Sequence, residues 1–184
     1  KNVLQLIYTT LNDIPMSHSM RVLRLKSFTD VNESIKEHRF IELMATLGVF
    51  QGESDGSFLP NAPVTRLYLT KFMAQIMELE PLDETPIFSD VDLNDPNSMY
   101  IQVAIQEGLI SAQPDGSFRP NQPLTLNQII DYLSNARIIR KLDVEDGDRV
   151  VTRKVFAEFL SLTPQYEIQI DELLDWETGY YEDE

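Results

Sequence analysis

Apolar residues recur along the chain at a spacing that is typical of amphipathic helices. The shared spacing is i, i+3, i+4 and i+7, and it occurs at Ile41, Met44, Ala45 and Gly48 and again at Ile101, Ala104, Ile105 and Gly108. A second stripe follows each segment, at Leu69, Phe72, Met73 and Ile76 and at Ile129, Ile130 and Leu133. The pattern predicts helices near residues 38–47, 66–78, 98–107 and 126–136, with one more near 153–162.

The polar segments between these helices repeat as well. "DGSFLPN" occupies residues 55–61 and "DGSFRPN" occupies residues 115–121, an offset of 60 residues that also relates "FTDV" at 28–31 to "FSDV" at 88–91. No gap is needed over many Gly, Pro, Asp and Phe positions. Each unit is therefore one structural module, a helix, a glycine loop and a second helix. The predicted fold class is mainly α, built from tandem helix-loop-helix repeats.

The residues of the loop predict its local structure. In an Asp-Gly turn the glycine takes a positive φ angle, so we expect positive φ at Gly56 and Gly116. The aromatic residues Phe58 and Phe118 are expected to be buried. A threonine precedes each second helix, and we expect it to cap that helix at residues 65, 125 and 152.

The repeat divides the chain into five predicted segments. These are an N-terminal helix (1–11) and linker within 1–27, a first repeat at 28–80, a second at 88–138, a degenerate third at 142–164 and an acidic tail at 165–184. The tail carries Trp176, Tyr180 and Tyr181, and either docking on a partner protein or packing back on its own domain fits it. Because the chain opens at Lys1 without a leader, we expect it to be part of a longer protein.

Charge excludes some partners. The 184 residues carry 15 Lys and Arg against 30 Asp and Glu, a net charge of −15. Nucleic acids and anionic lipid surfaces are bound by clustered cations, so neither is expected as a partner. The sequence also lacks an apolar run of membrane-spanning length, and we expect no direct insertion into a membrane.

Catalytic and metal-binding chemistry have little support. His18 and His38 are isolated, and no catalytic or cofactor motif occurs, so we expect neither an enzyme nor a cofactor. Acidic clusters occur at 90–95 and 143–148, but neither has the glycine and terminal glutamate of an EF-hand loop. Solvated loops are the better interpretation of both clusters.

The order of these motifs resembles the S-layer homology (SLH) family, over roughly residues 28–162. The family pattern runs F-x-D-V, an amphipathic helix, G-x-x-x-G, D-G-x-F-x-P-N and T-R-A-E, and the first repeat matches it with FTDV, GVFQG, DGSFLPN and VTR. The resemblance implies three units around a pseudo-threefold axis. It also implies an exported bacterial protein, at the cell surface, in the cell wall or in the periplasm, that is anchored by an acidic, often pyruvylated, cell-wall polysaccharide.

The resemblance further implies carbohydrate-binding residues, carried over position by position. They are Asp30, Gly52, Gly56, Thr65, Arg66, Asp90 and Arg153. We expect a surviving pocket around Arg66 rather than Arg153, because the third repeat lacks a full loop. Replacing Arg66 by alanine is then expected to remove polymer retention and to leave the melting temperature nearly unchanged, although a structural contact at the helix start is an equal interpretation.

Other positions depart from the family pattern. The arginine is Leu126 in the second repeat, the second glycine of its loop is Ala112, and the tryptophan that commonly opens the first helix is missing from both repeats. An alternative hypothesis is therefore a degenerate scaffold that serves protein–protein assembly with other envelope proteins without sugar binding. The retained Thr65-Arg66 pair and the two Asp-Gly loops favour the sugar-binding hypothesis.

Overall fold

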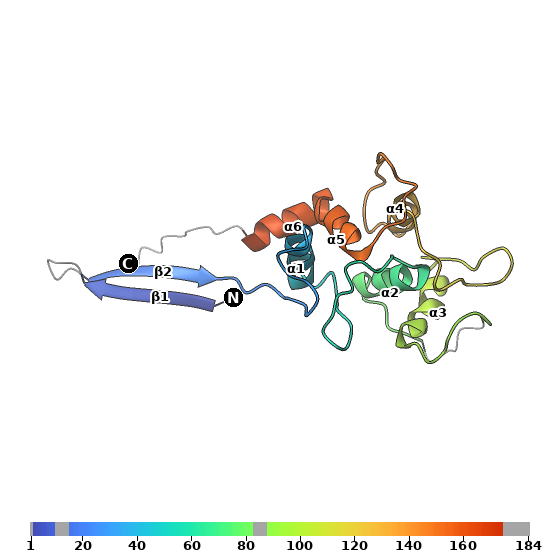
Figure 1. Ribbon diagram of the computed structural model, residues 1–184, viewed down its shortest axis with the longest axis horizontal. Helices are drawn as coiled ribbons and strands as arrows, with labels where there is room; N and C mark the ends of the chain where they lie inside the picture. The colour runs from blue at the N-terminus through green and yellow to red at the C-terminus, as the bar shows by residue number, and fades with distance from the viewer. Residues whose placement is uncertain (1, 10–14, 83–87, 175–184) are drawn as a thin grey trace.

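The computed structural model describes residues 2–9, 15–82 and 88–174, and its main body is helical (Figure 1). The elements in chain order are β1 (Asn2–Thr9), β2 (Pro15–Val22), α1 (His38–Thr46), α2 (Arg66–Ile76), the short 3-10 helix η1 (Pro96–Ser98), α3 (Met99–Gln106), α4 (Leu126–Asn135), α5 (Arg153–Ser161) and α6 (Pro164–Leu174). The five helices expected from the apolar stripes correspond to α1 to α5, each within two residues at either end. The prediction of a mainly α fold is confirmed.

The N-terminal segment differs from the expectation. Residues 2–9 form a strand rather than a helix, and they pair antiparallel with Pro15–Val22, which lies in the segment expected to be a linker. The predicted helix at 1–11 is therefore wrong. β-Branched and aromatic residues such as Val3, Ile7, Tyr8 and Thr9 favour a pleated strand once a partner strand is available. The hairpin extends away from the helical body (Figure 1).

Three backbone hydrogen bonds form a closed ring at the centre of the helical body. The N–H of Val64 donates to Val151 (2.8 Å), that of Leu124 to Val64 (2.9 Å) and that of Val151 to Leu124 (3.2 Å). All three residues are buried, and each lies just before the second helix of its repeat. Because each repeat donates to one neighbour and accepts from the other, the three units meet around a pseudo-threefold axis. The expected arrangement is confirmed.

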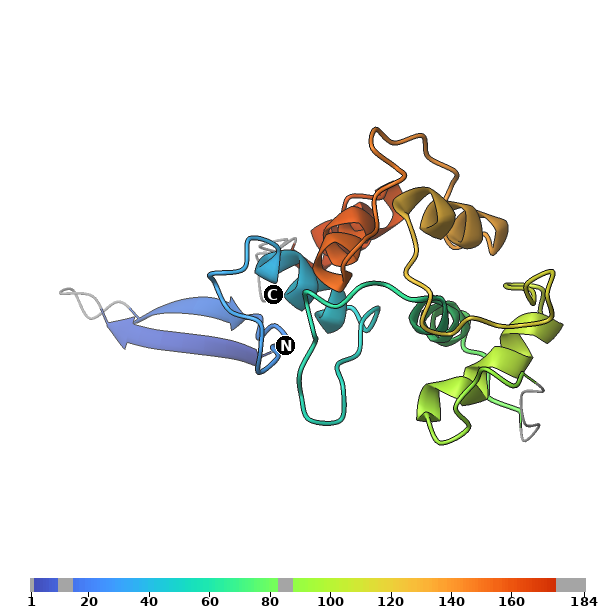
Figure 2. The same cartoon turned by 45° about the vertical axis from the view of Figure 1, so that its right-hand side comes forward.

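The same cyclic order governs the packing of helices. The first turn of each second helix donates backbone hydrogen bonds to the loop of another repeat: α2 to Pro120 and Gln122, α4 to Gly147 and Arg149, and α5 to Pro60 and Ala62. The paired helices also come from different repeats, since α2 packs against α3 and α5 against α1 (Figure 2). The third repeat has no first helix, so α4 lacks an equivalent partner in the described part of the chain.

Each glycine loop is held by the aspartate of the F-x-D-V segment. Asp30 accepts backbone hydrogen bonds from Phe58 (2.7 Å) and Leu59 (2.8 Å). Asp90 does the same in the second repeat, with Phe118 (3.0 Å) and Arg119 (2.7 Å). Leu59 and Arg119 have left-handed φ angles of 57° and 58°, a conformation that is unfavourable for these side chains. The two carboxylates therefore stabilise a strained turn.

The loop conformation otherwise matches the sequence-based expectations. Gly56 and Gly116 have φ angles of 81° and 80°, where glycine avoids the steric cost of a Cβ. Phe58 and Phe118 are completely buried, which confirms that they anchor the loops in the core.

Replacing Asp90 by asparagine is expected to destabilise the protein by about 1 kcal/mol at pH 7, because an amide keeps a single acceptor oxygen for two N–H donors. The hydrogen bond from Phe118 lowers the pKa of Asp90, so its contribution is present above the unfolded-state pKa and is lost as the pH falls through the folded-state pKa. Urea unfolding of wild type and variant should therefore differ at pH 7 and converge in strong acid. A pH-independent difference would contradict the role of the charge.

The C-terminal segment begins with a helix rather than with an extended tail. α6 follows α5 directly, packs against it and buries Tyr166. The acidic tail expected at 165–184 is thus partly helical, and Trp176, Tyr180 and Tyr181 lie outside the described residues. None of the described helices combines the length and the apolar character needed to cross a membrane.

Candidate functional site

Three equivalent positions open the second helices and face the loop of a neighbouring repeat. They are occupied by Arg66 in α2, Leu126 in α4 and Arg153 in α5. The preceding threonines lie at the N-cap position of these helices. Thr65 and Thr125 accept cap hydrogen bonds from the backbone, whereas Thr152 makes no such bond.

Each of the three guanidinium nitrogens of Arg66 donates a hydrogen bond within the protein. Its Nε donates to the carbonyl of Phe118 (2.8 Å), its Nη2 to the carbonyl of Ser111 (2.9 Å) and its Nη1 to the hydroxyl of Tyr132. The guanidinium also lies over the Phe118 ring, at 5.0 Å from the centroid, and the residue is 1% exposed. These contacts connect the first repeat to the second. The structure therefore changes the expectation for Arg66: we now expect its removal to destabilise the protein.

Leu126 offers no polar atom at the second position, as the sequence indicates. Its side chain is buried, and the backbone of α4 at this point is hydrogen bonded to the degenerate loop of the third repeat. The second repeat therefore has no cation at the T-R position to bind an anion.

Arg153 is buried but only partly bonded. The residue is 4% exposed, and its Nη1 donates to Oε1 of Glu53 at 2.6 Å. Nε and Nη2 are buried and have no hydrogen-bond partner among the described residues. The guanidinium is stacked over the rings of Tyr68 (4.3 Å) and Phe58 (4.8 Å). A buried charged group with unused donors is costly unless a ligand satisfies it.

A narrow cleft of about 10 Å³, enough for about one water molecule, lies beside Arg153, between the loop of the first repeat and α2. Its polar lining consists of Gln51, Glu53, Tyr68, Lys71, Gln75 and Arg153. The formal charges of Arg153, Lys71 and Glu53 sum to a net positive value, which suits an anion. Burial raises the pKa of Tyr68 to about 12, so its hydroxyl stays protonated and able to donate. We call these six residues the Arg153 groove.

The remaining expected site residues lie in the loops and caps. Asp30 and Asp90 accept the backbone hydrogen bonds described above, Gly56 forms the turn, and Thr65 accepts a bond from the backbone N–H of Tyr68. Gly52 lies against the carbonyl of Ser57 and the ring of Phe28. These contacts shape the loop beside Arg153.

Sequence reasoning missed five residues of the groove: Gln51 and Glu53 in the loop of the first repeat, and Tyr68, Lys71 and Gln75 in α2. The three residues of α2 follow one another at spacings of three and four, so they share a helix face that the apolar stripe leaves out. A polar stripe opposite the core face was the signal available in the sequence.

Comparison with known proteins agrees with this geometry. The sequence model of the family described as "S-layer homology domain" matches residues 27–67 and 87–128. The chain is 26% identical over 156 residues to the "Surface-layer 125 kDa protein" of Lysinibacillus sphaericus, covering 81% of this chain and 13% of that protein. It is 27% identical over 121 residues to a "Cell surface protein" of Thermoanaerobacter kivui, covering 63% and 16%. A match to the amylopullulanase of Thermoanaerobacterium thermosulfurigenes, 26% identical over 104 residues, covers 56% and 6%. The chain thus spans a small part of each relative.

Proposed function

Because this chain belongs to the S-layer homology family, we propose that it is a non-catalytic module that anchors a longer exported protein to the bacterial cell envelope. In this proposal the module binds an acidic cell-wall polysaccharide through the Arg153 groove. The observation that carries it is the buried guanidinium of Arg153, with two nitrogen atoms that lack a partner among the described residues. The names of the surface-layer and cell surface relatives support the location.

The two unbonded nitrogen atoms of Arg153 are buried, so a carboxylate reaches them once the side chains that line the narrow cleft move aside. Nε and Nη2 lie on one edge of the guanidinium plane, and such an edge binds the two oxygens of a carboxylate in parallel. The contact between Nη1 and Glu53 fixes the plane, and the Tyr68 ring supports its face. A ketal-linked pyruvate on a sugar presents a carboxylate of this kind. Tyr68, Lys71 and Gln75 then offer donors to neighbouring oxygens of the sugar.

Replacing Arg153 by alanine is expected to reduce retention on a purified pyruvylated wall polysaccharide at least tenfold, since the variant loses the bidentate donor. Arg39→Ala is the matched control, because Arg39 is an exposed arginine of α1 that lies outside the groove. The second control is the same polymer after acid removal of its pyruvate. Wild-type protein should bind this treated polymer as weakly as Arg153→Ala binds the intact polymer. Retention that survives Arg153→Ala in a folded protein would overturn the proposed site.

A second candidate function is favoured by the residues at the other two equivalent positions. Arg66 is already bonded by protein groups, and Leu126 has no donor, so two of the three equivalent positions offer nothing to an anion. A scaffold of this kind suits protein–protein assembly in the envelope without sugar binding. If wild-type protein ignores the wall polymer but associates with purified envelope proteins, this second function replaces the first.

A further inference from the structure

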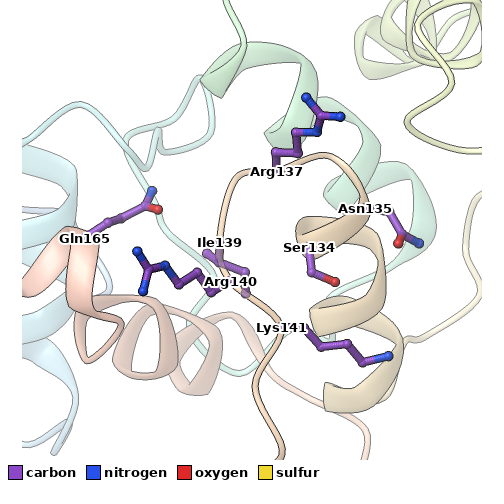
Figure 3. A pocket seen from close by; sticks show the side chains of 7 residues that line it. All are labelled: Ser134, Asn135, Arg137, Ile139, Arg140, Lys141 and Gln165. Atoms are coloured by element: carbon purple, nitrogen blue, oxygen red, sulfur yellow. The ribbon is translucent and has the colours of Figure 1, made fainter.

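An open groove of about 610 Å³ lies at the C-terminal end of α4, and it shares no lining residue with the Arg153 groove. It is lined by Ser134, Asn135, Arg137, Ile139, Arg140, Lys141 and Gln165 (Figure 3). The first six residues come from the end of α4 and the segment that follows it, and Gln165 comes from the first turn of α6. Arg140 extends toward Gln165 across the groove (Figure 3). We call this the Arg137–Arg140 groove.

The groove lies where the third repeat lacks its first helix. α3 of the second repeat packs on α2 of the first repeat, and Ala74 of α2 is completely buried. Ser134 holds the same position in α4, but it is only half-buried and lines the groove. The loss of one helix has therefore left an open space on α4, and the sequence has placed polar side chains around it.

The charges around this space are opposite to those at the equivalent place in the first repeat. The segment after α2 carries Glu78 and Glu80, whereas the segment after α4 carries Arg137, Arg140 and Lys141. Lys141 pairs with Asp131 at 3.1 Å. Arg137 and Arg140 are exposed and form no ion pair within the described residues. In a chain with a net charge of −15, this is a local excess of positive charge.

We propose that the Arg137–Arg140 groove binds the carboxylate or phosphate groups of an acidic polysaccharide. The proposal extends the anchoring function above, on which it rests, by adding a second contact for an anionic polymer. Arg137 and Arg140 supply forked donors for an anionic group. The hydroxyl and amide groups of Ser134, Asn135 and Gln165 suit the hydroxyls of a sugar.

The lining favours a polysaccharide over a protein partner. Protein interfaces depend on buried aromatic or aliphatic anchors at their centre. Ile139 is the single apolar residue of this lining, and it is itself buried at 5% exposure. A groove of charged and amide groups therefore has no pocket for an apolar anchor of a protein. It offers many hydrogen-bonding groups to a polar polymer.

The test measures binding of the whole chain to two defined polyanions, polygalacturonate for carboxylates and polyphosphate for phosphates, at low and at raised salt. Arg137→Glu with Arg140→Glu is expected to weaken binding at least tenfold. The control is Arg24→Glu with Arg39→Glu, which changes the net charge equally at two exposed arginines outside the groove and should stay within twofold of wild type. Preference for one of the polyanions identifies the bound group, and raised salt should weaken either complex.

Three results would overturn the proposal: binding of neither polyanion by wild type, equal losses in the two double variants, or no loss in either. The neutral pair Arg137→Gln and Arg140→Gln repeats the test if the charge reversal prevents folding, as judged by circular dichroism. Arg153→Ala is measured in parallel. If Arg153→Ala loses binding and the double variant at Arg137 and Arg140 keeps wild-type affinity, the proposed site in the Arg137–Arg140 groove is refuted and the one in the Arg153 groove stands. If the double variant loses binding and Arg153→Ala keeps it, only the site in the Arg153 groove is refuted.

Discussion

Replacing Arg66 by alanine is expected to destabilise the folded protein by about 3–5 kcal/mol, the largest loss that we anticipate for a single side chain. The substitution removes three hydrogen bonds and leaves the carbonyls of Phe118 and Ser111 without their donor. Each unsatisfied buried acceptor costs about 1–3 kcal/mol, and the cavity of the lost side chain adds to that. All three contacts join the first repeat to the second, so their loss also loosens the cyclic arrangement.

Urea unfolding of Arg66→Ala measures this loss, and Arg153→Ala is its matched control. Arg153 opens the equivalent helix and is also buried, but it donates one hydrogen bond, to Glu53 at 2.6 Å, instead of three. We expect its removal to cost clearly less. Arg66→Met adds a further comparison, because it keeps most of the buried volume while removing the donors. Equal stabilities of the two alanine variants would show that the hydrogen bonds of Arg66 contribute little.

Local features of the fold could be predicted from the sequence. The positive φ of Gly56 and Gly116 follows from the Asp-Gly turns, and the helix starts at residues 66 and 126 follow from their caps. Such features depend on a few neighbouring residues, so the sequence contains their cause. The pseudo-threefold arrangement is not local, and it was predicted from the family resemblance.

The candidate site could be predicted only in part, because its chemistry depends on contacts between repeats. The sequence favours Arg66 over Arg153 as the ligand-binding arginine, whereas the hydrogen bonding in the structure favours Arg153. The difference lies in Nε and Nη2: in Arg66 they donate to the carbonyls of Phe118 and Ser111, whereas in Arg153 they have no partner among the described residues. Sequence reasoning about one repeat at a time does not show which groups of a neighbouring repeat each arginine meets.

The N-terminal error has a different origin. The apolar residues of 1–11 fit a helix or a strand. In a short segment without clear cap residues, their spacing does not decide between the two. The decision is made by Pro15–Val22, which supplies the partner strand. Pairing across a turn is a contact between two segments, and neither segment predicts it alone.

Replacing Gly52 by alanine is expected to destabilise the protein by about 2–3 kcal/mol, because the added methyl group has no room. A Cβ at this position would lie 2.6 Å from the carbonyl oxygen of Ser57 and 2.7 Å from the ring of Phe28. The carbonyl of Ser57 cannot move freely, since it accepts a hydrogen bond from the N–H of Glu53 at 2.7 Å. Phe28 is buried and packs on Phe58, with ring centroids 5.1 Å apart. The loop must therefore shift, and Glu53 shifts with it.

The second repeat provides the control for this substitution, since it already carries Ala112 at the equivalent position. There the ring of Phe88 is only half-buried, and its centroid lies 5.6 Å from that of Phe118, a looser pair than in the first repeat. Ala112→Gly should change the stability by less than about 1 kcal/mol, the usual entropic effect of glycine. Thermal unfolding of both variants tests the difference. Because Glu53 holds Arg153, Gly52→Ala should also weaken retention on the wall polysaccharide, and a variant with wild-type stability and retention would show that the first loop has room that its contacts do not indicate.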